Sequence, residues 1–238
     1  MEMIDLSQTI GPGGYERPFH PKVTIEPLMT HEESSKKFHG KFSFQAMTIT
    51  LSDHTGSHVD ALNHYIPGPD ASSIDRLPLE RFFTGAVCVD FSDVPPRTYI
   101  ERSHIDRELE RHGLAIERGD TFLYYTGHYE RCFNDPDPDK WWKDFAGLSR
   151  PATEHLADLG VMNIGCEAFT IENPTEMFPD SEEPYPSHQV CKERGLLNTE
   201  NLVIPRRLVG KRFRFVCLPL KLRGGTGSPT RAVALLDG

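Results

Sequence analysis

The hydrophobic positions of this chain fall into short runs separated by turn-forming residues. The runs are rich in Val, Ile, Phe, Thr and Tyr and are bounded by Gly, Pro or Asp, a pattern typical of β-strands. We expect strands at residues 23–25, 42–51, 85–91, 121–126, 161–164 and 212–220. In the second run, Met47, Ile49 and Leu51 alternate with smaller or polar residues, which predicts a strand buried on one face.

Two segments carry helix signals instead. The first begins after Ser103 and ends near Gly113, because Ser is a frequent N-cap and Gly a frequent stop. The second lies between Ser149 and Gly160 by the same reasoning. Two segments with many polar residues or prolines and no helical or strand pattern, 128–147 and 172–187, are predicted to be long loops. Alternating strands and helices predict a mixed α/β fold.

Length and charge limit the classes of protein that this chain can be. Its 238 residues, 37% hydrophobic and 26% charged, suit a single globular domain spanning residues 1–238. A formal net charge of −9 with scattered basic residues argues against nucleic acid as the main partner. No apolar stretch approaches the roughly 20 residues that a membrane helix needs. We therefore expect a small-molecule partner, with neither a nucleic acid nor a membrane involved.

The cysteines indicate the compartment. An odd number, widely spaced and without a CxxC pair, does not describe a disulfide framework or a zinc ribbon. The N-terminus shows no secretory signal pattern. The five are Cys88, Cys132, Cys166, Cys191 and Cys217. We expect no disulfide framework, burial of Cys88 and Cys217 inside apolar runs, and a cytoplasmic protein.

Candidate chemistry concentrates in residues 52–64. Three histidines, His54, His58 and His64, lie within this segment together with Asp60. Imidazole nitrogen and carboxylate oxygen are ligands for zinc-type divalent ions, and two His with one carboxylate leave coordination positions open for catalysis. The alternative interpretation is a polar loop with local hydrogen bonds, which would be the more frequent outcome for any one of these histidines alone.

Neither a regular helix nor a regular strand would bring these groups to one ion. On a helix Asp60 would point away from His54 and His58. On a strand the outer residues, ten positions apart, would be separated by about 33 Å. We therefore predict a sharp bend after the 42–51 strand, with Gly56 permitting unusual dihedrals. Asp53 lies outside the ligand pattern and is expected to support the turn or the ligands.

The segment at 54–64, HTGSHVDALNH, resembles the HxGTHxDxPxH signature of the metal-dependent cyclase family, which includes bacterial kynurenine formamidases and isatin hydrolases. Ser57 stands where Thr is usual, and Leu62 where Pro is common. The resemblance extends over nearly the whole chain, and the other segments that carry it are residues 5–7, 119–127 and 227–232.

The resemblance implies a swivelling β/β/α fold and a homodimer or homotetramer. It implies that His54, His58 and Asp60 hold a divalent ion, zinc or manganese, and that His64 acts catalytically in proton transfer. It adds His188 and Glu200 as metal ligands that complete the site, with one or two ions per chain. Without it, His188 would be interpreted as a loop histidine and Glu200 as a carboxylate on a helix surface.

The function implied is hydrolysis of an amide, cyclic amide, imide or lactone carbonyl by metal-activated water. A non-haem iron oxygenase also uses two His and one carboxylate and is the more distant alternative. A catalytic cysteine and a non-catalytic binder are weaker alternatives. Substrate-binding candidates are aromatic, and they are Tyr125, Trp141 and Trp142, while Phe38 and Phe42 are expected in the pocket wall or in the core.

Overall fold

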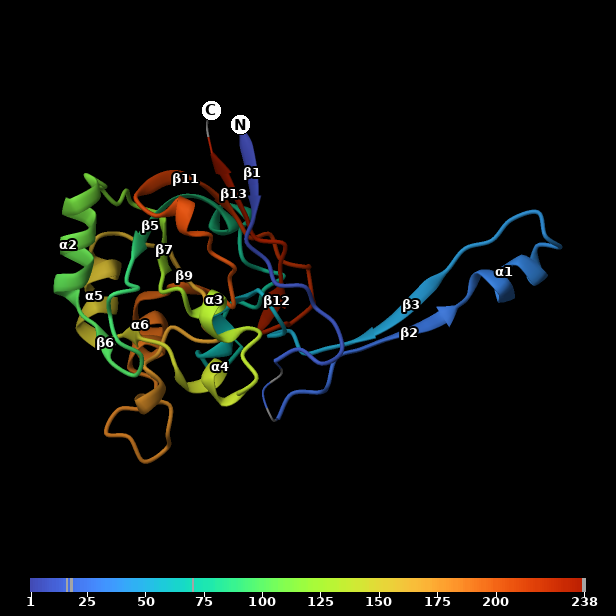
Figure 1. Cartoon of the computed structure of the whole chain (residues 1–238), viewed down its shortest axis with the longest axis horizontal. Coiled ribbons are helices and arrows are strands. Elements are labelled where there is room, and N and C mark those ends of the chain that lie inside the picture. The colour runs from blue at the N-terminus through green and yellow to red at the C-terminus, as the bar shows by residue number, and fades with distance from the viewer. Residues whose placement is uncertain (16, 18, 70, 237–238) are drawn as a thin grey trace.

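The structure, a computed structural model, describes residues 1–15, 17, 19–69 and 71–236. One large sheet contains β1 (Glu2–Asp5), β4 (His58–Asp60), β5 (Phe83–Asp90), β7 (Thr121–Tyr125), β9 (Asn163–Cys166), β10 (Leu197–Glu200), β11 (Lys211–Val216), β12 (Gly227–Pro229) and β13 (Val233–Leu236). Their order across the sheet is β1-β13-β11-β5-β7-β9-β10-β4-β12 (Figure 1). The central strands β5, β7, β9 and β10 are mutually parallel, and the flanking ones are antiparallel.

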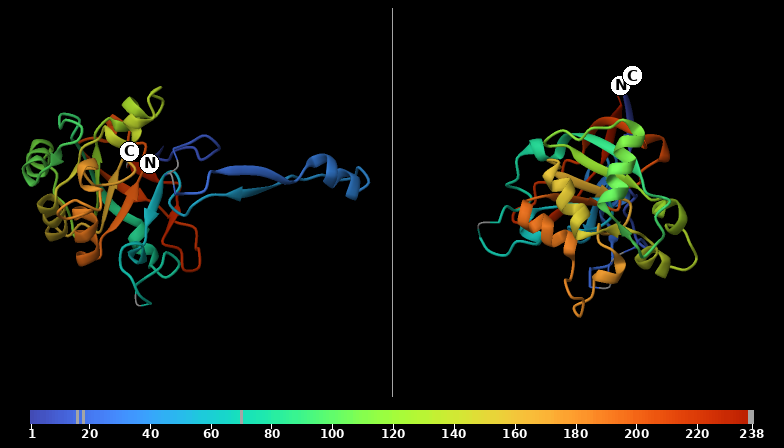
Figure 2. Two further views of the ribbon diagram at one scale, coloured as in Figure 1. Left: turned by 90° about the horizontal axis from the view of Figure 1, so that it is seen from below. Right: turned by 90° about the vertical axis from the view of Figure 1, so that its left-hand side faces the viewer.

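Helices cover one face of this sheet. They are α2 (Arg102–His112), α5 (Arg150–Asp158) and α6 (Pro186–Arg194), and Figure 2 shows them as one layer. The first two confirm the helices expected from the sequence. Side chains alternate between two cores: Val87 and Val89 face the helices, while Ala86 and Cys88 face the inner side of the curled sheet. The mixed α/β prediction is confirmed.

The loop predicted at 128–147 is partly wrong. It contains two short helices, α3 (His128–Cys132) and α4 (Asp139–Lys143). Each has five residues, which is too short for a repeating apolar face to be visible in the sequence. The segment 172–187 is irregular apart from one 3₁₀ turn, and α6 begins at its end.

A two-stranded arm projects from the body. It consists of β2 (Thr24–Met29), the short helix α1 (His31–Lys37) and β3 (Ala46–Thr50). Figures 1 and 2 show from perpendicular directions that it extends away from the large sheet. The expectation of a half-buried strand is wrong for this chain alone, because Met47 through Thr50 are all exposed. The strand is also shorter than the predicted 42–51, and α1 was not anticipated.

All five cysteines are free, which agrees with the predicted lack of a disulfide framework. All five are also buried, whereas the sequence predicted burial only for Cys88 and Cys217. None of the helices in the described part of the chain combines the length and the hydropathy that crossing a bilayer would require.

Candidate metal centre

The predicted ligand segment folds as a bend followed by a very short strand. The chain turns at Gly56, where φ is +61°, and then forms β4. Val59 packs into the inner core, so its neighbours His58 and Asp60 point to the opposite side. His64 closes a 3₁₀ turn, η1 (Leu62–His64). The predicted bend is therefore present, and it brings the ligand candidates to one place.

Strand pairing supplies the distant carboxylate. Glu200, at the end of β10, is the register partner of His58 on β4, and both residues are buried. The interpretation of Glu200 as a helix-surface carboxylate is therefore wrong. His188 is also not a loop residue, because it lies in the first turn of α6. The structure brings both residues to the 54–64 segment.

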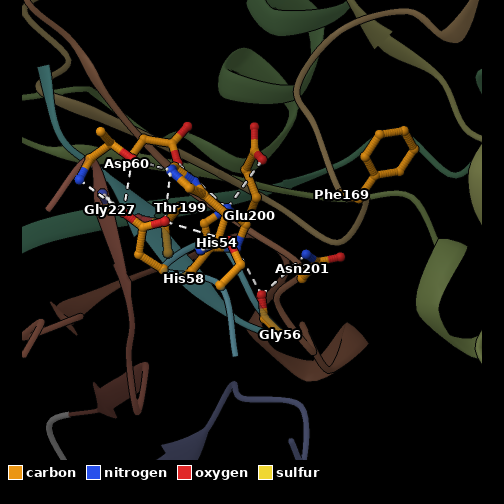
Figure 3. Close-up of polar contacts among 12 residues, drawn as sticks. His54, Gly56, His58, Asp60, Phe169, Thr199, Glu200, Asn201 and Gly227 are labelled. Carbon is orange, nitrogen blue, oxygen red and sulfur yellow. Dashed lines mark hydrogen bonds and ion pairs between the residues drawn. The ribbon is translucent and has the colours of Figure 1, made fainter. Parts of the chain in front are cut away.

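Short distances connect the cluster, and Figure 3 shows part of it. His54 Nδ1 lies 2.8 Å from Asp60 Oδ1, and His58 Nε2 lies 3.4 Å from the same oxygen. His58 Nε2 is 3.6 Å from Glu200 Oε2. On the other side, His188 Nε2 lies 3.8 Å from Asp60 Oδ2 and 3.6 Å from Glu200 Oε1. Asp60 therefore occupies the centre of the cluster.

The two carboxylates are poorly satisfied by the chain. Among the residues that the structure describes, none donates a hydrogen bond of good geometry to either oxygen of Asp60 or to Glu200 Oε1. Burial, followed by the nearby Asp60 charge, raises the pKa of Glu200 to about 7. Burial opposes ionisation of Asp60, but the neighbouring histidines, His54 first, hold its pKa well below the usual value. Burying anionic oxygens without hydrogen-bond donors costs free energy, and a positive charge placed beside them would offset that cost.

Hydrogen bonds orient two of the histidines so that one ring nitrogen of each faces these two carboxylates. His58 Nδ1 lies 2.8 Å from the Gly56 carbonyl oxygen, which leaves its Nε2 facing Asp60 and Glu200. His188 Nδ1 lies 2.7 Å from Glu172 Oε1, which leaves its Nε2 facing the same carboxylates. Bonds of this kind fix the tautomer of metal-binding histidines.

Sequence reasoning missed Glu172. This carboxylate is fully buried and accepts hydrogen bonds from the backbone N–H groups of Ser187 and His188, at the start of α6. It thereby holds the first helical turn and the ring of His188 together. A carboxylate at a helix N-terminus is electrostatically favourable. Glu172 begins the irregular segment 172–187, where no local pattern distinguishes it.

Asp53 supports the opposite side of the cluster, as expected. Its Oδ2 accepts hydrogen bonds from the N–H and hydroxyl of Thr226, at 2.9 and 2.8 Å, and from the N–H of Gly227. The Thr226 hydroxyl in turn lies 2.9 Å from His54 Nε2. Any side chain at Gly227 would lie only 2.8 Å from the His54 ring, so glycine is required there.

His64 lies closer to the cluster than a purely peripheral base would. Its ring centroid is 4.2 Å from that of His54, and its ligand atoms group with those of His54 and Asp60 in one potential coordination set. A second such set contains His58, Asp60 and Glu200. Burial lowers the pKa of His64 to about 4. The geometry therefore allows His64 to be either a ligand or a neutral proton acceptor.

The cluster forms the floor of a cavity of about 340 Å³. Phe19, Tyr65 and Tyr185 supply aromatic walls, and Arg17 and Lys192 line the cavity as well. This volume is at the small end of the range for ligand pockets, so it suits a compact organic molecule.

The aromatic residues expected to bind substrate lie elsewhere. Tyr125 is buried on β7, where its hydroxyl donates to Glu130. Trp141 is buried and stacks on Tyr15, and Trp142 packs edge-on against Phe169. None of these candidates is among the residues that line the cavity, and Phe38 and Phe42 are exposed at the end of the arm rather than in a pocket wall or a core.

The donor set fits a divalent ion of the zinc or manganese type. It combines imidazole nitrogens with carboxylate oxygens, it is buried, and its central carboxylate lacks hydrogen-bond donors. Ligand atoms within each of the two sets lie within 4.8 Å of one another, and both sets share Asp60.

Comparison with known proteins agrees with this chemistry. A family model described as a putative cyclase matches residues 4–173, most of the chain. The chain belongs to this cyclase family. The kynurenine formamidase of Salinibacter ruber is 31% identical over 98% of this chain and 97% of its own length. The isatin hydrolase of Roseibium aggregatum is 25% identical over 91% of this chain and 82% of its own length.

Solved structures share the fold of this chain. Isatin hydrolase A from Ralstonia solanacearum superposes with a TM-score of 0.86, over 99% of this chain and 92% of that one, at 23% identity. The family resemblance derived from the 54–64 segment is thus confirmed, and with it the expected fold.

Proposed function

We propose that this cyclase-family chain is a metal-dependent hydrolase that cleaves a non-peptide C–N bond, in an amide or cyclic amide, of a small molecule. The observation that carries the proposal is Asp60, whose two buried oxygens lack donors while three histidines surround them at the floor of a cavity. Relatives named kynurenine formamidase and isatin hydrolase support the bond class, and the His, Asp and Glu donor set supports the metal dependence.

The residues divide into two roles. His54, His58 and Asp60 would hold the ion, with His188 and Glu200 completing the set. A divalent ion in such a site supplies positive charge that acidifies water and polarises a carbonyl group. His64, neutral at physiological pH, accepts a proton from the attacking water and returns it to the leaving nitrogen. Phe19 and Tyr185 position the flat part of the substrate in the cavity.

The finer assignments are also proposals. Two potential ligand sets that share Asp60 support two ions per chain, and the same residues would also hold a single ion. Zinc and manganese both suit nitrogen and oxygen donors. Five buried free thiols support a cytoplasmic location, and we propose the homodimer or homotetramer that the family resemblance implies.

A lactone is the alternative substrate of the same site, because polarisation of a carbonyl does not depend on the leaving atom. A non-haem iron oxygenase is the more distant alternative. It requires Fe(II) and oxygen, whereas hydrolysis proceeds under anaerobic conditions.

The test combines metal content with a substrate panel. Protein purified without a His-tag or chelator is analysed for metals and assayed anaerobically on N-formyl aryl amides, cyclic amides and lactones. We expect one or two equivalents of zinc or manganese per chain and turnover of the C–N substrates. Absence of metal after reconstitution, or turnover that requires oxygen, would contradict the proposal.

A His64→Ala variant separates the two roles of this residue. Retained metal with a large loss of kcat supports proton transfer, whereas a loss of metal identifies His64 as a ligand.

A further inference from the structure

Two basic side chains in the wall of the metal cavity have no part in the roles proposed above. Arg17 comes from the segment between β1 and β2, and Lys192 comes from α6. Neither of them forms an ion pair with a carboxylate among the residues that the structure describes. Two separate elements of the fold therefore bring unpaired positive charge to the same cavity.

Arg17 is held in place by Phe169 while most of its donors stay unused. Its Nη2 donates to the Phe169 carbonyl oxygen at 3.2 Å, and its Cζ lies 4.8 Å from the centre of the Phe169 ring. Figure 3 shows Phe169 together with the ligand cluster. A guanidinium group has five N–H donors in a rigid fork that matches the two oxygens of a carboxylate. Within the described part of the chain, this one hydrogen bond uses a single donor, so the fork is available to a ligand.

Helix α6 sets the position of Lys192 relative to the metal centre. His188, whose Nε2 faces the two carboxylates, lies four residues before Lys192 on this helix, so both side chains project from one face. Four residues advance an α-helix by about 6 Å. Lys192 therefore starts about one helical turn farther from the ion than His188 does. This offset suits a ligand with an aromatic ring between the group at the ion and the group at Lys192.

The charge of the cavity favours an anion once a metal ion is bound. The two basic side chains offset the charges of Asp60 and Glu200, so a divalent ion leaves the cavity with a net positive charge. Burial, followed by the Arg17 charge, lowers the pKa of His20, another cavity residue, which is therefore neutral at physiological pH. The chain as a whole has a formal net charge of −9. A positive cavity on a negatively charged molecule concentrates anionic ligands.

We propose that the substrate carries a carboxylate in addition to the bond that is cleaved, and that Arg17 and Lys192 bind this carboxylate. The assignment rests on the proposed function, which places the cleaved amide at the ion. The aromatic walls formed by Phe19 and Tyr185 then enclose the ring between the two ends. The substrate class is an aromatic amide or cyclic amide with a ring carboxylate that lies away from the cleaved bond. Arg17 and Lys192 are thus specificity-determining residues.

The first test compares two substrates that have the same shape but differ in charge. They are meta-formamidobenzoate and its neutral carboxamide, and formate release by the metal-loaded enzyme measures kcat/KM for each. A hydrogen bond to a charged group contributes about tenfold or more, so we expect a preference for the anion of about 100-fold. The preference should decrease as the ionic strength rises, because salt screens exposed charges.

Variants assign this preference to the two residues. In the double variant Arg17→Gln and Lys192→Gln, the ratio of the two kcat/KM values should fall by about 100-fold. Arg17→Lys keeps the charge but loses the fork, so it should lose only part of the preference. Lys211→Gln removes the same charge on β11, outside the cavity, and should leave the ratio unchanged. Circular dichroism checks that each variant folds.

The second test measures binding without turnover. Benzenesulfonate, a weak metal ligand, and methyl phenyl sulfone, its neutral counterpart, are titrated into the metal-loaded protein in a calorimeter. The sulfonate should bind the wild type at least about tenfold more tightly than the sulfone, and this difference should disappear in the double variant.

The two tests separate the anion site from the hydrolase activity. A wild type that does not prefer the anion in either measurement, or a preference that the double variant keeps, would overturn the proposal. If neither formamide is turned over but the double variant loses the tighter binding of the sulfonate, the result counts against the proposed hydrolysis and supports the anion site.

Discussion

The metal centre and the arm adjoin each other in the sequence, yet the rest of the chain leaves them incomplete in opposite ways. At the centre, Asp60 and Glu200 bury anionic oxygens without enough donors. On the arm, Ile49 and Phe42 expose apolar surface without cover. Buried charge requires opposite charge, and exposed apolar surface requires apolar cover. The buried carboxylates therefore indicate a bound ion, and the uncovered apolar side chains of the arm indicate contact with protein.

The largest expected effect is on the metal centre. Replacing His58 with Ala removes a proposed ligand whose Nε2 faces both carboxylates, so metal content and turnover should fall to the background level. Elemental analysis and steady-state kinetics measure the two losses. His31→Ala, on the arm, is the matched control and should keep both. Full activity of His58→Ala would mean that activity does not depend on an ion held by His58, and the contrast between the metal centre and the arm would not hold.

Metal removal should destabilise the fold. An ion at 1,000 times its dissociation constant stabilises the folded state by about 4 kcal/mol. For a chain of 238 residues this corresponds to a Tm difference of about 8–16 °C. Differential scanning calorimetry of chelator-treated and reloaded protein measures it. His58→Ala should show no such increase on reloading, and an equal Tm for both wild-type samples would mean that Asp60 and Glu200 need no ion.

Glu167 shows what a buried carboxylate does when the chain supplies donors to only one of its oxygens. Its Oε2 accepts hydrogen bonds from Thr126 and His128, its Oε1 has no donor among the described residues, and burial raises its pKa from 4.5 to about 7. The folded state thus holds this proton more tightly than the unfolded state. Its contribution to stability is complete below about pH 4.5 and is lost as the pH rises through about 7, amounting to about 3 kcal/mol.

Urea unfolding between pH 4.5 and 8 tests this prediction. Glu167→Gln keeps an acceptor for the same donors but cannot ionise. The difference in unfolding free energy between variant and wild type should therefore shift in favour of the variant as the pH rises. A difference that does not change with pH would mean that Glu167 has an ordinary pKa.

A smaller effect is expected at Glu172, which positions His188 without facing the cavity. Glu172→Gln weakens the bond to His188 Nδ1, so metal affinity should fall about 10- to 100-fold while the fold persists. Competition with a chelating dye measures the affinity. Glu176→Gln, in the same irregular segment, is the control. An unchanged affinity would exclude His188 as a ligand oriented by Glu172.

The smallest effect is expected at the end of the arm. The buried Ser34 hydroxyl donates to the Phe44 carbonyl, at 2.7 Å, and accepts from the Phe44 N–H. Ser34→Ala should cost about 1 kcal/mol locally, seen as about fivefold faster amide exchange near residue 44. Metal content should not change. A loss of metal in this variant would show that the arm and the centre are coupled.

The sequence predicted the chemistry of the site only where its residues are neighbours along the chain. His54, His58 and Asp60 share one bend, so spacing and residue type sufficed to group them. His188, Glu200 and Glu172 come from a helix start, a strand end and an irregular segment, and no local pattern records that β10 pairs with β4. For His188 and Glu200 the family resemblance supplied what the residues themselves did not, and Glu172 was missed.

For the fold, the sequence by itself determined the elements that are long enough for their hydrophobic periodicity to be recognised. In the body of the protein these are the strands β5, β7, β9 and β11 and the helices α2 and α5. It did not reveal α3 and α4, because five residues give too few turns for a pattern. Alternation at Met47 and Ile49 correctly distinguished an apolar from a polar face, but not whether anything covers the apolar one. Burial depends on what lies opposite a residue in space, and only the tertiary structure decides that.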